Sequence, residues 1–318
     1  MNGAVPDTSP ASPRVSPDLA IGLLVIIWGV NFSVVKWALG QFDPLAFNGI
    51  RFTLGAAVLV PFVLRGRGLA RFERRDWLPL IALGVLGNTV YQVLFVVGID
   101  LTLAGNAALM LAMAPAFVTL LSAGLRHEHI RAAGWVGVLL STVGIALVLT
   151  GAADVRFGRE TIAGDLLMLA AAAAWAVYTV GASPLVRRHG ALSVTGVTMW
   201  IGAGLLLLVS TPSLAGQDWA RTTPLGWTAL VISGALAVGL SYVIWYHGVE
   251  HLGSARTAVF SNTVPIVALA TAWLTLGETP GAQQLVGAAL IVGGVLLTRL
   301  RGTERAVEET TELPKSCA

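Results

Sequence analysis

The segment WGVNFSVVKW, residues 28 to 37, places an amide and an ammonium group inside an otherwise apolar stretch. Trp28, Asn31 and Phe32 follow the i, i+3, i+4 spacing of one helical face, and Lys36 lies about one turn further on. A charged side chain at the centre of a membrane helix costs about 2.5–3.5 kcal/mol on insertion scales. We therefore expect Trp28, Asn31 and Phe32 to line a substrate-binding cavity. Lys36 is close to the end of the stretch, so its ammonium group can reach water, and we expect it in a vestibule.

Four further apolar stretches carry polar or aromatic residues of the same kind. Asn88, Tyr91 and Gln92 repeat the helical spacing. The other candidates for substrate contact are Trp175, Tyr178, Tyr242, Trp245 and Asn262. Amide side chains are poorly tolerated in lipid, which favours a place along a cavity. The alternatives are hydrogen bonding between helices for the amides and anchoring at the membrane interface for the aromatic rings.

One arginine and two prolines also interrupt apolar stretches. Arg51 lies about two turns inside the second stretch, where it can face the outer vestibule or bond free backbone carbonyls. Pro115 and Pro265 remove a backbone hydrogen bond, which predicts a kink in each helix. The kinks either let the helices bend during gating or are static packing features.

The acidic residues favour structural roles. Glu128 and Glu278 each fall just before an apolar stretch, and Asp165 opens one, so we expect all three to cap helix N-termini. We place every acidic residue in a tail, a loop or the end of a stretch. Neither of the two lysines lies in a phosphate-binding Gly-rich loop, which excludes ATP as an energy source in this chain. We expect no enzyme activity, no metal and no cofactor.

The elements that must position these residues are membrane-spanning helices. The chain is 55% hydrophobic and 12% charged, with a mean hydropathy of +0.77, whereas soluble domains have about 25% charged residues. A bilayer core needs about 20 apolar residues per helix. Ten stretches meet this length: 19–39, 44–64, 77–98, 102–124, 132–150, 164–186, 192–211, 227–248, 254–276 and 282–299. We therefore predict an all-α polytopic membrane protein with ten transmembrane helices.

The positive charges orient these helices. With a cytoplasmic N-terminus, the inner segments hold fifteen Lys and Arg residues and the outer segments hold three. Cytoplasmic loops carry the excess of Lys and Arg in membrane proteins. We predict that both termini are cytoplasmic, and that the pI of about 9.4 reflects topology and not nucleic-acid binding.

The chain contains an internal repeat, because residues 111–147 and 261–297 align without gaps at an offset of 150. The matched pairs, which continue upstream, include Pro115 with Pro265, Glu128 with Glu278, Gly137 with Gly287, Gly144 with Gly294 and Gly84 with Gly234. Each half has five helices, an odd number, so the second half must run inverted. Inverted repeats in carriers bind substrate near the membrane midplane where the halves meet. We therefore predict two inverted five-helix repeats around a central cavity.

Several short motifs carry a family resemblance. They are WGVNF at 28–32, the Arg51–Phe52 pair, HE after the Pro115 helix, GDLLMLAAAAAWAVY at 164–178 and LGE at 276–278. Together they resemble the EamA-type members of the drug/metabolite transporter superfamily over about residues 19–299. The resemblance implies a ten-helix exporter or facilitator of small metabolites, often amino acids. Small multidrug exporters of that superfamily use a buried Glu in their first helix, which this sequence lacks.

The predicted organisation is a cytoplasmic tail (1–18), a first repeat (19–150), an external linker (151–163), a second repeat (164–299) and a second tail (300–318). We expect a secondary transporter in a bacterial cytoplasmic membrane, a monomer or homodimer, that exports small molecules by alternating access. An importer or a sugar or nucleotide-sugar carrier is the main alternative. A channel is less favoured. An intramembrane enzyme is also less favoured, because no nucleophile, histidine or carboxylate converges at membrane depth.

Overall fold

The computed structural model describes residues 16–65, 72–125, 132–151, 158–252, 257 and 260–300. Over these residues it consists of helices and short turns, with no β-strand. Seven of the described helices are long and apolar enough to cross a membrane, and three shorter apolar helices fall at the other predicted spans. The prediction of an all-α polytopic membrane protein is confirmed.

The first repeat contains α1 (Pro17–Ala38), α2 (Pro44–Arg65), α3 (Trp77–Gly84), α4 (Tyr91–Leu101), α5 (Ala104–Leu111), α6 (Ala114–Gly124) and α7 (Ala132–Gly151). The second contains α8 (Gly158–His189), α9 (Ala191–Val209), α10 (Thr211–Gly216), α11 (Pro224–Ile232), α12 (Ser241–Leu252), α14 (Val264–Leu276) and α15 (Ala282–Leu300). Two 3₁₀ turns, η1 (Arg74–Asp76) and η4 (Trp219–Arg221), precede α3 and α11. Helix α8 begins inside the segment predicted as a linker.

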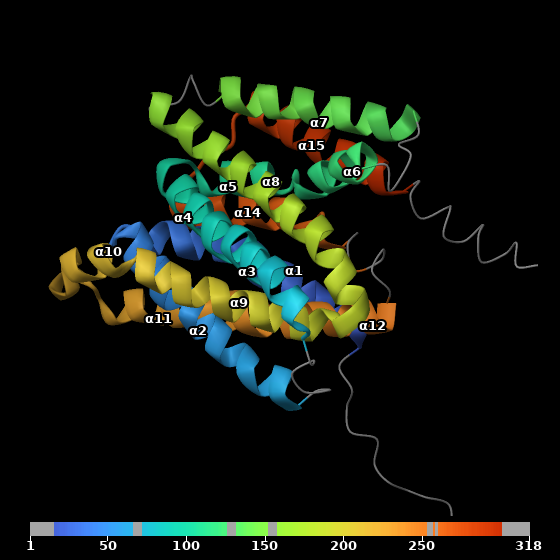
Figure 1. Cartoon of the computed structure of the whole chain (residues 1–318). Coiled ribbons are helices and arrows are strands. Elements are labelled where there is room, and N and C mark those ends of the chain that lie inside the picture. Colours follow the sequence, from blue (N-terminus) through green and yellow to red (C-terminus); the bar gives the residue numbers. More distant parts are fainter. Residues whose placement is uncertain are drawn as a thin grey trace, which may run out of the picture.

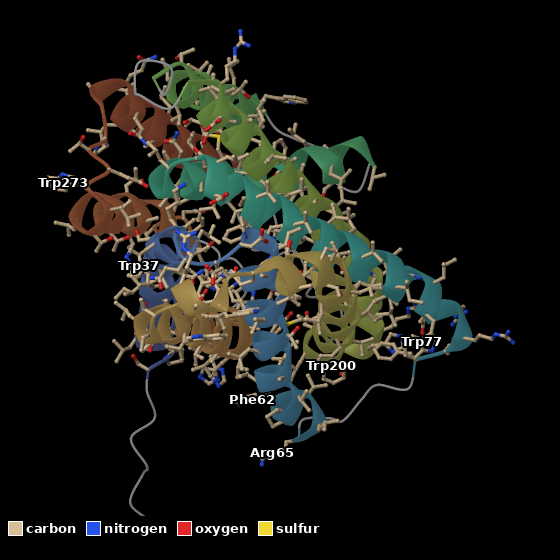
Figure 2. The ribbon with its side chains drawn as sticks, turned by 90° about the vertical axis from the view of Figure 1, so that its left-hand side faces the viewer. Trp37, Phe62, Arg65, Trp77, Trp200 and Trp273 are labelled. Carbon is tan, nitrogen blue, oxygen red and sulfur yellow. The ribbon has the colours of Figure 1, made fainter. Side chains whose placement is uncertain are left out.

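The outer surface of the bundle is apolar. Leu78 is 77% exposed and Leu274 is 75% exposed, which suits a surface in contact with lipid tails. Figure 2 shows Trp77 and Trp273 projecting outward on opposite sides of the molecule. The polar side chains described below are therefore held inside an apolar shell.

Two of the membrane-crossing segments contain a π-helical stretch at matched positions. One is η2 (Val85–Val90), between α3 and α4, and the other is η5 (Ser233–Leu240), between α11 and α12. A π-helix shifts the backbone hydrogen-bonding pattern by one residue and is often found at functional sites. In η5 the backbone carbonyl of Ala237 accepts a hydrogen bond from Trp28 Nε1 at 3.2 Å.

Pro115 and Pro265 do not kink continuous helices, and this prediction was wrong. Helix α5 ends at Leu111 and α6 begins at Ala114, so Pro115 is the second residue of a new helix. Pro265 is likewise the second residue of α14. Proline is favoured in the first turn of a helix, because its missing N–H would have no partner inside the helix there. Each proline therefore starts a helix after a break.

The two halves meet first through α7 and α15, which lie side by side in Figure 1. A Cβ atom on Gly144 would be 2.6 Å from the Gly287 carbonyl oxygen, and one on Gly294 would be 2.4 Å from the Gly137 carbonyl oxygen. Only glycine lets two helix backbones approach this closely. The internal repeat matches Gly137 with Gly287 and Gly144 with Gly294, and each contact joins one glycine of each matched pair, so the pairing helices are repeat equivalents.

The halves also meet at the two π-helices. Segment η5 packs on α2 of the first repeat, and η2 packs on α9 of the second. A Cβ atom on Gly234 would lie 2.7 Å from the Arg51 carbonyl oxygen, and one on Gly84 would lie 2.9 Å from the Thr198 carbonyl oxygen. Both glycines had been matched by the repeat. The contact between a π-helix and a helix of the other half thus occurs twice.

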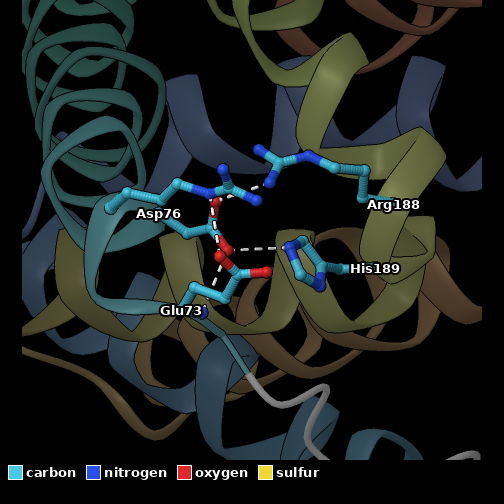
Figure 3. Close-up of polar contacts among 5 residues, drawn as sticks. Glu73, Asp76, Arg188 and His189 are labelled. Carbon is cyan, nitrogen blue, oxygen red and sulfur yellow. Dashed lines mark hydrogen bonds and ion pairs between the residues drawn. The ribbon is translucent and has the colours of Figure 1, made fainter.

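A polar cluster fastens the end of α8 to the start of α3 (Figure 3). Asp76 is buried and accepts from Arg188 Nη1 and His189 Nε2, each at 2.9 Å. The backbone N–H of Glu73 donates to the same carboxylate at 3.0 Å. The arrangement satisfies a buried carboxylate with three donors, so its role is structural.

Candidate functional site

A buried arginine lies at the contact between α2 and η5. Arg51 is 2% exposed, and its guanidinium Nη2 donates to Gln92 Oε1 at 2.9 Å. Its Nη1 is 3.4 Å from the hydroxyl oxygen of Ser233. The rings of Phe47 and Phe95 lie 5.9 Å and 5.2 Å from the guanidinium carbon, within range of cation–π attraction. Its hydrogen bonds go to side-chain oxygens and not to the free carbonyls that were one of its two expected partners, and its place in an outer vestibule stays a prediction.

This arginine belongs to a hydrogen-bonded network that joins the two halves. The Ser233 hydroxyl donates to Asn31 Oδ1 at 2.6 Å. The Asn48 amide donates to the backbone carbonyl of Gln92 at 2.8 Å. We call Asn31, Asn48, Arg51, Gln92 and Ser233 the central polar network. Its members come from α1, α2, α4 and η5, so it spans both repeats.

Two members of this network were not among the predicted residues. Ser233 lies in an apolar stretch without any periodic polar pattern, and Asn48 lies in the first turns of α2. The sequence contained one signal for Ser233, since it directly precedes Gly234, a glycine matched by the repeat. Asn31 and Gln92, which were predicted, do come together here through Ser233 and Arg51.

Aromatic rings flank the network on the α1 and α12 side. Trp28 and Trp245 have ring centroids 5.6 Å apart. The Trp28 indole N–H is fixed by the Ala237 carbonyl, so its ring has a defined orientation. Tyr242 and Tyr246 stack further along α12, and the Tyr246 hydroxyl contacts Thr195 of α9.

A second row of rings extends from the network toward α8. The successive ring contacts are Phe32 with Phe95, Phe95 with Tyr91, Tyr91 with Trp175 and Trp175 with Tyr178, with centroids 5.9, 6.2, 5.2 and 5.1 Å apart. The Tyr178 hydroxyl bonds Thr198 at 3.1 Å. The sequence-predicted aromatic residues of three separate spans are therefore adjacent in space.

Two predicted amides lie apart from the central polar network. Asn88 is on η2, where a Cβ atom on Gly202 of α9 would be 2.2 Å from its own Cβ. Asn262 lies in the turn before α14, and its buried amide nitrogen has no hydrogen-bond partner among the described residues. Their roles in substrate binding remain predictions.

Lys36 is fixed at the end of α1. Its Nζ donates to the backbone carbonyl of Asp100 at 2.6 Å. Asp100 is in the last turn of α4, where carbonyls have no partner inside the helix and a cation is favoured. Lys36 therefore caps the C-terminus of α4. Its place in a vestibule stays a prediction.

Glu278 caps a helix, but not the one expected. Its two carboxylate oxygens accept from the backbone N–H groups of Ala104 and Gly105, at 2.9 and 3.1 Å. These are the first residues of α5 in the other repeat, and not the start of α15, which follows Glu278 in the chain. The carboxylate meets two unpaired donors and the positive end of the helix dipole. Glu278 thus ties the α14–α15 turn to the first repeat.

Asp165 does not open its helix, so its predicted capping role was wrong. Helix α8 begins at Gly158, and Asp165 is fully buried within it. Its carboxylate accepts from the Thr102 hydroxyl and from the Asn106 amide. It therefore joins α8 to the start of α5, and not every acidic residue lies at a span end as expected. Glu128, the third predicted cap, lies outside the described residues.

Two cavities in the described part of the molecule lie away from the central polar network. A cavity of about 940 Å³ separates α14 from α15 and is lined by apolar residues such as Leu269, Trp273 and Val292. A polar cavity of about 310 Å³ lies between the α1–α2 turn and the segment after α10, near Gln41 and Gln217. The described residues contain no cluster of three or more His, Cys, Asp or Glu suited to hold a metal ion.

Comparison with known proteins identifies the type of molecule. The sequence pattern of the EamA-like transporter family matches residues 15–150 and again 162–300. A probable terminal-alkyne amino-acid exporter of Streptantibioticus cattleyicolor is 32% identical over 92% of this chain and 96% of that protein. A probable amino-acid metabolite efflux pump of Salmonella typhimurium is 29% identical over 89% of this chain and 96% of that protein.

A solved structure described only as a crystal structure of a protein has the same fold. Its TM-score is 0.63 at 25% identity, and the match covers 92% of this chain and 99% of that one. The family match includes both repeats, and the membrane-length helices agree with it. The chain belongs to the EamA-like transporter family and is a multi-pass membrane transporter of small molecules.

Proposed function

We propose that this protein is a secondary transporter that exports small metabolites of the amino-acid type by alternating access. The observation that carries the proposal is the central polar network, which joins Asn31 and Arg51 of the first repeat to Ser233 of the second. Carriers built from inverted repeats bind substrate near the midplane, between the repeats. A ligand held at this network contacts both halves and biases their relative arrangement.

The relatives support the choice of substrate and direction. Two of them are named as probable exporters of amino acids or their metabolites. The network offers amide, hydroxyl and guanidinium groups beside the aromatic rings of Trp28 and Trp245. Such a mixture suits a small molecule with polar ends and an apolar side chain. The distribution of positive charge favours cytoplasmic termini in a bacterial cytoplasmic membrane.

The test is transport by purified protein in liposomes, with a panel of labelled amino acids and organic acids. We expect flux down a gradient that saturates with concentration, as carriers show and open channels do not. Trp28→Ala removes an aromatic surface beside the network and should reduce kcat/KM about tenfold or more. Trp135→Ala is the matched control, because Trp135 lies on α7 and is 55% exposed on the surface.

Flux that rises without saturation would contradict a carrier mechanism. An absence of flux across the panel would contradict the substrate class. Equal loss of transport in Trp28→Ala and Trp135→Ala would show that the tryptophan acts through general stability, and the site assignment would then be wrong.

A further inference from the structure

We propose that Arg51 binds a carboxylate group of the transported molecule. The inference rests on the proposed transport function and names the part of the substrate that the central polar network recognises. In the structure, the two Nη atoms of Arg51 each face one neutral oxygen, from Gln92 at 2.9 Å and from Ser233 at 3.4 Å. A carboxylate presents two oxygens in the geometry that matches this guanidinium fork.

The first argument is charge. Taking a guanidinium out of water costs several kcal/mol unless an anion or a full set of acceptors compensates it. The ion pairs among the described residues involve Arg75, Arg188 and His189, and none involves Arg51. Its Nε atom is also buried without a hydrogen-bond partner among those residues. Among the described residues, the Arg51 guanidinium therefore has neutral acceptors and aromatic rings around it but no carboxylate partner.

The second argument is the internal repeat, which shows that the fold does not need this charge. A Cβ atom on Gly234 of η5 would lie 2.7 Å from the backbone carbonyl of Arg51, and one on Gly84, at the end of α3, would lie 2.9 Å from the backbone carbonyl of Thr198. Because the repeat matches these two glycines, the position on α9 equivalent to Arg51 is Thr198. One crossing therefore carries a neutral hydroxyl group and the other a cation.

The same comparison applies to the partners of Arg51. Ser233 corresponds to Leu83, and Gln92 corresponds to Tyr242. At the other crossing the Thr198 hydroxyl bonds the Tyr178 hydroxyl at 3.1 Å, so both crossings hold polar groups but only one holds a cation. Since helix packing is satisfied at both crossings, the charge at one of them is best explained by an anionic ligand that binds there.

The third argument concerns the class of anion. Arg51 supplies a single positive charge, which balances a monoanion such as a carboxylate and leaves a phosphate dianion undercompensated. Asn31 and Gln92 add neutral amide groups, which bond polar atoms without adding charge. The site therefore favours one carboxylate next to neutral polar atoms.

The position of the contact between α2 and η5 explains how a ligand can reach Arg51. Helix α2 belongs to the first repeat and η5 to the second, so movement of the repeats against one another separates Arg51 from Ser233. Alternating access requires a movement of this kind. Binding of a carboxylate would replace the Ser233 and Gln92 contacts and so couple substrate binding to the arrangement of the halves.

The experiment is competition against a labelled amino acid in liposomes that contain the wild-type protein. The competitors share one side chain and differ in the acidic group: the acid, its primary amide, its decarboxylated amine, and its phosphonate and sulfonate analogues. We expect the wild-type protein to prefer the acid over the amide about 10–100-fold, as a charged hydrogen-bonded pair predicts. Arg51→Gln should abolish this preference, and Arg51→Lys should retain part of it.

Arg65→Gln is the matched control, because Arg65 is on the same helix and exposed at its end. It should keep the wild-type preference. If Arg51→Gln does not fold, the wild-type competition alone decides the question. Equal inhibition by acid and amide, or tighter binding of the phosphonate or sulfonate, overturns the inference. Transport of metabolites without carboxylate preference leaves the proposed function intact, whereas no transport of any panel member contradicts the proposed function itself.

Discussion

Ser233 connects the residues of the central polar network that come from different repeats. Its hydroxyl donates to Asn31 Oδ1 and accepts from Arg51, and the side chain is fully buried. When a buried polar group loses its hydrogen-bond partner, the folded state is destabilised by the full desolvation free energy of that group. The Ser233 hydroxyl group therefore contributes to the stability of the contact between α1, α2 and η5, in addition to the packing of the helices.

Replacement of this hydroxyl gives a direct prediction. Ser233→Ala leaves the Asn31 oxygen without its donor and should lower the free energy of unfolding by about 1–3 kcal/mol. The measurement is a denaturant titration in mixed detergent micelles. Thr228→Ala on α11 is the control, since its exposed hydroxyl bonds only the carbonyl four residues earlier and its loss should cost less than about 0.5 kcal/mol. Similar losses for both variants would contradict the role of Ser233.

At the scale of single residues, the sequence indicated which polar residues belong to the site, but it did not indicate which residues they contact. Asn31 and Gln92 could be found because amides on an apolar helix face are unusual. Arg51 could be singled out, but its partners lie 41 and 182 residues away in the chain, at Gln92 and Ser233. Glu278 likewise caps a helix 174 residues away. Contacts of this range depend on how the helices pack, which no local pattern encodes.

At the scale of elements, the backbones of α7 and α15 are in close contact. A Cβ atom on Gly294 would lie 2.4 Å from the Gly137 carbonyl and from the Ser141 hydroxyl. Gly293, its neighbour in the chain, has no atom within 4 Å of the position of a Cβ atom. Helix packing therefore requires glycine at position 294 but leaves room for a larger side chain at position 293.

This difference predicts opposite effects of the same substitution. Gly294→Ala forces the helix backbones apart and should lower the free energy of unfolding by about 1–3 kcal/mol. Gly293→Ala meets open space and should raise it by about 0.5–1 kcal/mol, because alanine favours helix more than glycine does. Denaturant titration of both variants in the same micelles measures the two effects. Equal effects of the same sign would show that the α7–α15 contact does not determine stability.

The membrane-spanning helices were largely predictable, because a run of about 20 apolar residues has few structures available in a membrane. The breaks within these helices could not be predicted from the sequence. Pro115 and Pro265 indicated a disturbance, but whether a proline kinks a helix or begins one depends on the residues before it. The π-helices η2 and η5 left no sequence signal beyond the matched glycines near their starts, since their backbone shift is set by tertiary contacts.

At the scale of the whole molecule, the repeats exchange contacts. Helix α2 packs on η5, and α9 packs on η2, so each half completes the other. Alignment of the repeats identified equivalent residues, but equivalence does not state which elements touch. The exchange explains why the central polar network draws from both halves, because neither repeat has all of its members.

The orientation of the whole molecule gives the last prediction. Fifteen Lys and Arg residues in the inner segments, against three in the outer ones, predict a cytoplasmic C-terminus. Cys317 is the single cysteine of the chain, so a membrane-impermeant maleimide reports its side directly. It should label inside-out vesicles and leave right-side-out vesicles unlabelled. In a Cys317→Ser background, Ala215→Cys in exposed α10 should give the reverse pattern, because one membrane crossing separates α10 from the inner end of α9. Labelling of Cys317 in sealed right-side-out vesicles would contradict this orientation.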